Sequence, residues 1–289
     1  MAEIKSIKIV PFTLMSSSIS AILALIGAII LTLALGVIAA VLPPQFAPLA
    51  SLLAGFGLAA IIAYPILTFL IGLSTVFLSI LLYNLLAPKV GGVQLTMDGN
   101  NVESIPIVPF ALILSIIMAI WTFIMGLLLT TILAPVTGLI ISVIPLATNG
   151  TATGAGVGSL VTLGAIFFII VLPILVLIFG FIGHALFAAF YNFIAAKASK
   201  IQLNFEALPE NWHKLTEIPI IPAALALAVV SAIFGLIMGI LDFASGYGIM
   251  AFLIDFIGNF IYTFIIVAIG AGLYNFLAPK IGAVQLELE

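Results

Sequence analysis

The sequence contains neither cysteine nor arginine, and only 6% of its 289 residues are charged. Without cysteine, thiol nucleophiles, disulfides and thiolate metal sites are excluded. Without arginine, the bidentate clamps that guanidinium groups form on phosphate or carboxylate are excluded as well. A soluble domain carries about 25% charged residues, so this chain lacks the charge to cover an ordinary water-exposed surface. The small net charge of −3 gives no reason to expect a nucleic-acid partner.

What the chain has instead is apolar sequence, since 65% of its residues are hydrophobic. They form continuous runs longer than the roughly 18 residues that cross a bilayer core. Long continuous runs favour membrane helices over barrel strands, which show short alternating segments. The first run is also longer than the apolar region of a signal peptide, about 7–15 residues, so we expect a membrane helix that is retained.

Two phrases recur three times along the chain. A closing phrase reads YNLLAPKVGGVQL at 83–95, YNFIAAKASKIQL at 191–203 and YNFLAPKIGAVQL at 274–286, and an opening phrase aligns Pro11, Pro109 and Pro222. Such internal periodicity indicates a repeat architecture. We predict an all-α membrane protein with six transmembrane helices, arranged as three two-helix repeats around a pseudo-threefold axis and joined by short cytoplasmic β-ribbons. The repeats are 1–97, 98–206 and 207–289.

The closing phrase resembles the end of small uncharacterised prokaryotic membrane proteins, which are two-helix chains ending in a Tyr-Asn-x-x-Ala phrase, glycines and a strand. The resemblance implies three such units fused in one chain, and it carries no known activity. The middle copy departs from the pattern, with Ala196 for proline and Ser199-Lys200 for the glycines. The residues of the repeat signature are Tyr83, Asn84, Lys89, Tyr191, Asn192, Lys197, Tyr274, Asn275 and Lys280.

The seven lysines all fall at the strand ends of the units, and none falls in the predicted outer loops. Positive residues favour the cytoplasmic side of a membrane. We therefore expect a multi-pass protein of the cell membrane with both termini and all strands in the cytoplasm. Asn149 begins an Asn-Gly-Thr triplet in a predicted outer loop and is a candidate glycosylation site.

The closing segments alternate apolar and polar residues, as half-buried strands do. A turn signal, MDGNN at 97–101, predicts that the first closing strand folds back on the second opening strand. The link at 206–214 is expected to join the second and third units in the same way. The last strand, 284–289, then pairs with the first, around 4–9, and closes a ring. Because Pro106 and Pro219 lack the amide hydrogen of a central strand, we expect three separate ribbons rather than one six-stranded barrel.

Small residues at a spacing of four predict close helix packing. They are Ser16, Ser20, Ala24 and Ala28 in the first unit and Ser231, Gly235 and Gly239 in the third. The tyrosines of the signature are interpreted as headgroup anchors, and its asparagines as caps of the helix end or of the turn into the strand.

Polar groups inside membrane helices are candidates for function. His184 has two interpretations, a proton relay or a neutral ring hydrogen-bonded to a neighbouring helix. Asp255, Asn259 and Tyr262 follow an i, i+4, i+7 spacing. With Asp242 they form either an outer cation site or a wet helix end.

Catalytic constellations are missing from the sequence, because neither histidine has acidic residues at metal-ligand spacing. We predict a protein that is not an enzyme and has no cofactor or metal site. A structural or accessory subunit of a membrane assembly is the first hypothesis, with membrane lipid and other membrane-protein subunits as partners. A pore or transporter along the axis is the alternative. A lipid-binding protein is another, because the outer loops expected at 43–56 and 134–148 are apolar.

Overall fold

The computed structural model describes residues 2–147 and 162–289. Within them the protein is mostly helical, and six helices are long and apolar enough to cross a membrane. This agrees with the multi-pass helical membrane protein expected from the apolar runs. These six helices are Ile9–Val41, Pro44–Val90, Ile107–Leu133, Thr162–Ala198, Ile220–Ala244 and Gly248–Ile281.

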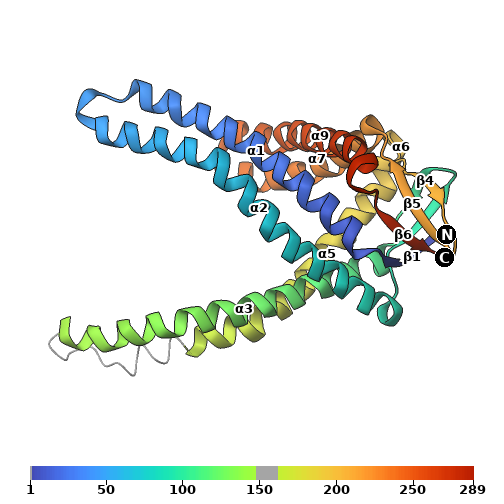
Figure 1. Cartoon of the computed structure of the whole chain (residues 1–289), viewed down its shortest axis with the longest axis horizontal. Helices are drawn as coiled ribbons and strands as arrows, with labels where there is room; N and C mark the ends of the chain where they lie inside the picture. Colours follow the sequence, from blue (N-terminus) through green and yellow to red (C-terminus); the bar gives the residue numbers. More distant parts are fainter. Residues whose placement is uncertain (1, 148–161) are drawn as a thin grey trace. The chain divides into compact units, whose positions relative to one another are not determined.

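Strands lie before, between and after the pairs of long helices in chain order (Figure 1). The strands are β1 (Ala2–Ile7), β2 (Gln94–Asp98), β3 (Asn101–Ser104), β4 (Asn204–Ala207), β5 (Trp212–Glu217) and β6 (Gln285–Leu288). The α-helices are α1 (Ile9–Val41), α2 (Ala47–Val90), α3 (Ile107–Ala147), α5 (Leu172–Phe190), α6 (Ala196–Ala198), α7 (Ile220–Ala244), α8 (Gly248–Leu253) and α9 (Asn259–Ile281). A 3-10 turn, η1 (Pro44–Phe46), and three π-helical turns, η2 (Phe167–Val171), η3 (Tyr191–Ala195) and η4 (Ile254–Gly258), complete the described elements.

The chain forms two compact units. The first, Met1–Ile105 with Phe190–Glu289, contains all six strands, the hairpin of α1 and α2, and the hairpin of α7 and α9. Figure 1 shows both hairpins leaving the strands, with the two chain termini lying among the strands. The second unit, Pro106–Ala189, holds α3 and most of α5.

The strands form one antiparallel sheet in the order β3-β2-β1-β6-β5-β4. Its two ends meet, because Asn101 in β3 forms a bridge with Gln202, just before β4. Two backbone hydrogen bonds hold this junction, from Val102 N–H to the Ile201 carbonyl at 2.8 Å and from Leu203 N–H to the Asn100 carbonyl at 2.9 Å. The strands therefore close into a ring, called the strand ring below.

Several predicted strand pairings are confirmed. Asp98 pairs with Asn101 across the first turn, and β4 pairs with β5 across the second. The terminal strands β1 and β6 pair antiparallel, with Ile4 opposite Leu288 and Ile7 opposite Leu286. The chain termini thus close the ring, as the sequence predicts.

The expectation of three separate ribbons is wrong, because the ribbons are also joined to one another. Strand β1 pairs with β2, and β5 pairs with β6. Pro106 and Pro219 do not interrupt the sheet, since β3 ends at Ser104 and β5 ends at Glu217. Pro219 is the N-cap of α7, a position where the missing amide hydrogen has no intrahelical partner to lose. The rule against proline in a central strand is valid, but these prolines lie beyond the strands.

Small residues let the helices of each hairpin approach closely. The spacing of Gly235 and Gly239 predicts this for α7. A side chain at Gly235 would meet the backbone of Asp255, and one at Gly239 would meet Phe252. In the first hairpin the prediction is shifted, because Ser17 is the serine that lies against Gly72. Ala24 and Ala28 are buried as expected, whereas Ser16 and Ser20 are only half-buried.

The opening helices differ in length although each begins two residues before its aligned proline. Helix α1 has 33 residues and α7 has 25, so α1 continues for about 12 Å more at 1.5 Å per residue. The residues of the first hairpin beyond this level, 34–56, are called the outer segment below. The loop expected at 43–56 is wrong for most of its length, since α2 begins at Ala47. The loop expected at 134–148 is likewise helical to Ala147, where α3 ends.

Candidate functional site

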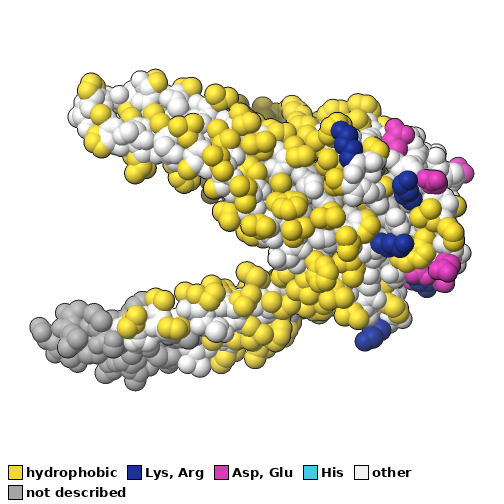
Figure 2. Space-filling view, viewed as in Figure 1, with side chains coloured by type: hydrophobic (Ala, Val, Ile, Leu, Met, Phe, Trp, Pro, Cys, Tyr) yellow, Lys and Arg dark blue, Asp and Glu magenta, His cyan; other side chains and the backbone are white. Residues whose placement is uncertain are grey.

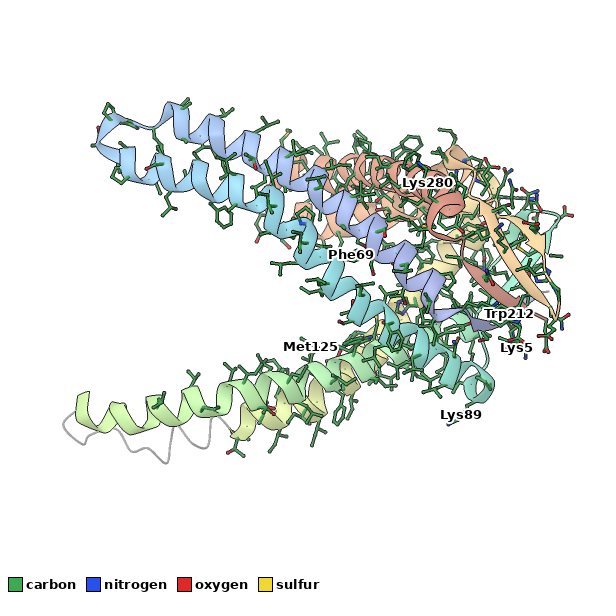
Figure 3. The ribbon with its side chains drawn as sticks, viewed as in Figure 1. Lys5, Phe69, Lys89, Met125, Trp212 and Lys280 are labelled. Atoms are coloured by element: carbon green, nitrogen blue, oxygen red, sulfur yellow. The ribbon has the colours of Figure 1, made fainter. Side chains whose placement is uncertain are left out.

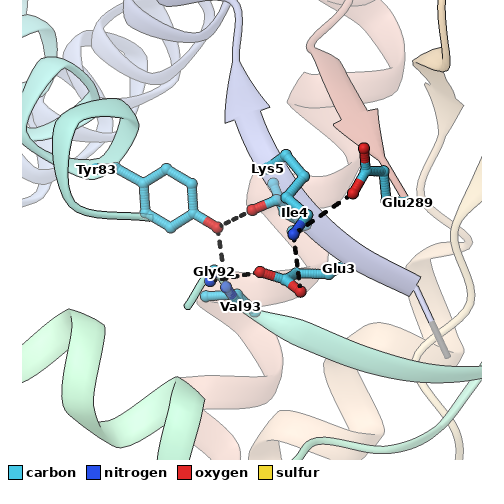
Figure 4. A network of polar contacts seen from close by, with 7 residues as sticks. All are labelled: Glu3, Ile4, Lys5, Tyr83, Gly92, Val93 and Glu289. Carbon is cyan, nitrogen blue, oxygen red and sulfur yellow. Dashed lines mark hydrogen bonds and ion pairs between the residues drawn. The ribbon is translucent and has the colours of Figure 1, made fainter. Parts of the chain in front are cut away.

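The polar contacts of the repeat signature gather where helices meet the strand ring. The Tyr83 side chain is only 4% exposed. Its hydroxyl donates a hydrogen bond to the Ile4 carbonyl at 2.6 Å and accepts one from Val93 N–H at 2.9 Å (Figure 4). Tyr191 makes the same two bonds with Val102 and Ile201 (2.6 and 3.1 Å), and Tyr274 makes them with Leu215 and Val284 (2.6 and 3.2 Å).

The neighbouring asparagines hold the start of the opening helices. The Asn84 amide accepts a hydrogen bond from Ile7 N–H and donates one to the Ile7 carbonyl, both at 2.9 Å. The second and third copies repeat this with Asn192 on Ile105 (2.7 and 2.8 Å) and Asn275 on Ile218 (2.8 and 2.9 Å). Each Tyr-Asn pair thus fastens the end of one helix to an opening strand, a closing strand and the start of another helix. This arrangement is called the clasp below.

The clasp corrects two interpretations of the signature. The tyrosines are not headgroup anchors, because an anchor exposes its ring to the membrane interface and all three rings are buried. The asparagines do not cap their own helix ends. They bond the backbone of the residue two positions before each opening helix, at the end of the opening strand, where the helical hydrogen bonds have not yet begun.

The middle copy makes the same hydrogen bonds, but its backbone has a different conformation between the helix and the closing strand. Gly91 and Gly282 end α2 and α9 with φ of +90° and +97°, a conformation that favours glycine. Ser199 at the equivalent position is extended, with φ of −158°. The π-helical turn η3 begins at Tyr191 itself, and it replaces the glycine turn as the local adjustment.

The clasps also differ in their acidic residues. In the first, Glu3 accepts a hydrogen bond from Gly92 N–H at 2.9 Å, and Lys5 lies 3.3 Å from Glu3 and 3.4 Å from Glu289 (Figure 4). The hydrogen bond from Gly92, helped by Lys5, lowers the pKa of Glu3 below its ordinary 4.5 despite partial burial. In the second, Lys200 pairs with Glu103. Sequence reasoning missed Glu3; its place one residue before Ile4 is the only signal it offers.

The signature lysines lie at the last turn of each closing helix, and all three are exposed. Figure 3 labels Lys89 and Lys280 beside the strand end of the structure. The Lys280 ammonium lies 3.1 Å from the ring centroid of Phe276, four residues earlier. Figure 2 shows apolar side chains covering the helices, with charged side chains gathered near the strands.

His184 lies in the second unit, on α5, apart from the clasps. Its ring packs edge-on against Phe110 at 6.1 Å between centroids. The Nδ1 atom is buried and makes no hydrogen bond with the described residues. The backbone group that it faces is that of Gly180, four residues earlier. Gly180 lies on α5 itself, so among the described residues Nδ1 makes no hydrogen bond to a neighbouring helix, and the ring contacts Phe110 of α3 instead.

The predicted cluster of Asp255, Asn259 and Tyr262 is only partly assembled. Asn259 donates to the Asp255 backbone carbonyl at 2.6 Å, and Thr263 donates to Ser231 on α7 at 2.8 Å. Tyr262 is 65% exposed and lies off this face. Asp255 lies in the π-helical turn at 254–258, whereas Asn259 and Tyr262 lie in α9, so the angular spacing of Asp255 to the other two differs from that of one continuous α-helix.

Among the residues that the structure describes, no three histidine, aspartate or glutamate side chains lie close enough together to hold a metal ion. Asn149, the candidate glycosylation site, lies outside the described residues.

The clasps use the polar residues of the signature for holding backbone, and they offer neither a nucleophile with a base nor a ligand set. Comparisons of the chain with protein-family models, with curated proteins and with solved structures give no match.

Proposed function

We propose that the protein is a non-catalytic structural or accessory subunit of a membrane assembly. In this proposal the chain arose as three fused two-helix units, and its strand ring repeats three times around an axis on the cytoplasmic side. The triplicate clasp supports the repeat, and the lysines near the ring support the orientation. The clasped ring holds the helices at one end, leaving their apolar surfaces free for lipid or partner helices.

The observation that carries the proposal is the outer segment, 34–56. The hairpin of α7 and α9, called the third hairpin, indicates how long a helix the membrane requires. Helix α7 ends at Ala244 and is followed by a polar turn, Ser245-Gly246-Tyr247. Its 25 residues span about 37 Å, enough for a hydrocarbon core of about 30 Å. The first hairpin continues past this level.

The outer segment has no charged residue, and most of its residues are exposed. Val41 is 75% exposed, Leu52 65% and Phe56 62%. Apolar surface that leaves the hydrocarbon core needs a cover, since exposed apolar patches mark interaction sites. A partner subunit that rises above the membrane provides this cover.

The ring itself favours the structural role over a pore. Val102, Leu215 and Leu286 are apolar, lie on its strands and are at most 8% exposed. A water-filled path through the ring would have to displace such packed side chains, whereas channels carry polar or charged linings.

The test is purification from the native membrane in mild detergent. We expect the full chain to co-purify with other membrane proteins in fixed stoichiometry. A variant in which residues 34–56 are replaced by Ser-Gly-Tyr, the turn of the third hairpin, should fold and lose those partners. A matched control, Leu70→Ala, removes an exposed apolar residue below the outer segment and should keep them.

Purification of the full chain alone, with ion flux after reconstitution in liposomes, would contradict the accessory role and support a pore. Retention of the same partners by the shortened variant would show that the outer segment is not the docking surface.

A further inference from the structure

We propose that the signature lysines form three binding sites for anionic phospholipid, one beside each clasp. Each site pairs an exposed lysine with an exposed apolar residue four positions earlier on the same helix. The lysine contacts the headgroup phosphate, and the apolar residue contacts the start of an acyl chain. The pairs are Leu85 with Lys89, Phe193 with Lys197, and Phe276 with Lys280. This proposal rests on insertion of the helices in a bilayer with the strand ring at its surface.

The first argument is the division of the lysines into two classes. Lys5, Lys200 and Lys214 stand on or beside the strands, and each forms an ion pair with glutamate. The ion pairs found in the described part of the chain include none with a signature lysine. The remaining lysine, Lys8, stacks over Trp212 at 4.9 Å. Lys280 likewise lies over an aromatic ring, that of Phe276 at 3.1 Å, but no carboxylate of the described residues pairs with a signature lysine. The signature lysines therefore keep a charge that can meet an external anion.

The second argument is the apolar residue beneath each lysine. Leu85 is 56% exposed, Phe193 66% and Phe276 58%. Residues four apart lie on one face of an α-helix, about 6 Å along its axis, which holds for the pairs in α2 and α9. In the middle copy the π-helical turn η3 contains Phe193 and shifts this spacing, so that pair rests on the exposure of both side chains. The apolar residue is the one farther from the helix end, so it lies toward the hydrocarbon and the lysine toward the headgroups. Lysines at helix ends extend to the interface in this way.

The third argument is the threefold occurrence of the pair. All three lysines belong to the first compact unit, and each follows its motif tyrosine by six residues. A lysine at a helix C-terminus also interacts favourably with the helix dipole. That role alone does not require an exposed apolar partner in each copy, and it does not depend on the charge of the lipid. Lipid dependence therefore separates the two roles.

The experiment measures thermal unfolding in nanodiscs of phosphatidylcholine alone and of phosphatidylcholine mixed with phosphatidylglycerol. We expect the native chain to unfold at a higher temperature in the anionic nanodiscs. The triple variant Lys89→Gln, Lys197→Gln, Lys280→Gln should lose most of this rise, and the corresponding Lys→Arg variant should keep it.

The matched control removes the same charge from the ring with Lys5→Gln, Lys200→Gln, Lys214→Gln. It should unfold earlier in both lipids, because its ion pairs are lost, but it should keep the rise. A full rise in the signature variant would overturn the proposal. So would an equal rise on adding inorganic phosphate to phosphatidylcholine nanodiscs, which would indicate an anion site without a lipid.

A second measurement tests the proposal if the triple variant folds poorly. With the native chain we expect a motionally restricted fraction of spin-labelled phosphatidylglycerol, and single Lys→Gln variants should each release part of it. If none releases any, the proposal is wrong. Neither readout involves a partner protein, so failure here leaves the accessory role standing, and loss of partners in the shortened variant leaves the lipid sites standing.

Discussion

At the scale of the residue, the tyrosine hydroxyl of each clasp joins two strands by donating to one and accepting from the other. The carbonyl that it bonds lies within an opening strand, and the amide lies just before a closing strand. A buried polar group left without its partner costs about 1–3 kcal/mol. The energetic role of the signature is therefore to complete the backbone hydrogen bonding of the ring.

The first prediction concerns these hydroxyls. Tyr83→Phe, Tyr191→Phe and Tyr274→Phe should each lower the free energy of unfolding by about 1–3 kcal/mol, because each leaves a carbonyl and an amide unpaired. Denaturant titration in detergent micelles provides the measurement. The control is Tyr262→Phe, whose ring is 65% exposed, with an expected change within about 0.5 kcal/mol. Three signature variants as stable as the control would remove the clasp from the account.

The second prediction concerns acid. The pKa of Glu3 is lower in the folded chain than its ordinary 4.5, so the unfolded chain binds the proton more readily. The stability that Glu3 contributes is therefore complete above its unfolded pKa and is lost as the pH falls through the lower folded value. Glu3→Gln should be less stable than the native chain at neutral pH, and the difference should shrink below pH 4.5.

Unfolding temperatures measured from neutral to acidic pH check this expectation. Glu210→Gln, at an exposed glutamate in the turn between β4 and β5, is the matched control and should follow the native curve. A stability difference for Glu3→Gln that stays constant with pH would show that its carboxylate makes no pH-dependent contribution.

At the scale of the element, the strands were largely predictable and the helix lengths were not. The glycine turn at 97–101 and the alternation of 284–289 predict the pairings found, because strand periodicity and turn chemistry are local signals. The continuous sheet does not follow from the sequence, because the strand before Pro106 ends at Ser104 and no local signal marks that boundary. A shift of two residues in a boundary reversed the conclusion.

Helix ends gave no comparable signal. The outer segment is apolar in sequence, and a hydrophobic loop and a hydrophobic helix have the same composition, so hydropathy does not separate them. The π-helical turns were missed for a related reason. They depend on packing between helices, as at Asp255 against Gly235, and no single residue type marks them. The clasp tyrosines were found by their repetition, but their burial required the fold.

The third prediction concerns the last strand. Glu3 N–H in β1 donates to the Glu289 carbonyl, and Lys8 N–H, just after β1, donates to the Gln285 carbonyl. Ile4 N–H in β1 donates instead to the Val93 carbonyl. A chain lacking residues 285–289 should exchange the amide hydrogens of Glu3 and Lys8 roughly fivefold faster, since each loses a hydrogen bond worth about 1 kcal/mol.

Residue-resolved hydrogen exchange by NMR in micelles tests this alternation. The Ile4 amide is the internal control and should stay protected, because its partner is in β2. Equal acceleration at all three amides would mean that β1 detaches as a whole. No acceleration at Glu3 or Lys8 would mean that β6 does not pair with β1.

At the scale of the whole molecule, the ring concentrates lysine at one end of the helices and the outer turns carry none. The fourth prediction is the resulting orientation. A cysteine at Phe46, in the turn between α1 and α2, should react with an impermeant thiol reagent added to intact cells. Cysteines at Asn100 and Glu210, in the turns between strands, should react only after permeabilisation. The native chain has no cysteine, so each label reports one site.

The opposite pattern would place the strand ring outside the cell and would invert the orientation while keeping the fold. Reaction at Phe46 and at only one strand turn in intact cells would be incompatible with strand turns that all lie on one side. Either result would also move the proposed lipid sites away from the anionic cytoplasmic leaflet.

The closed ring is the central claim, and a crosslink between its terminal strands tests it most directly. Ile4 and Leu288 are Cα partners across β1 and β6, and directly opposed residues lie about 4.5–5.5 Å apart, within disulfide reach. Cysteines at these two positions should form a disulfide in high yield under mild oxidation. Cysteines at Ile4 and Ala283 should not, because Ala283 is displaced along the strand by about 16 Å. Absence of the Ile4–Leu288 disulfide in folded protein, or equal yields for both pairs, would contradict a ring closed by the chain termini.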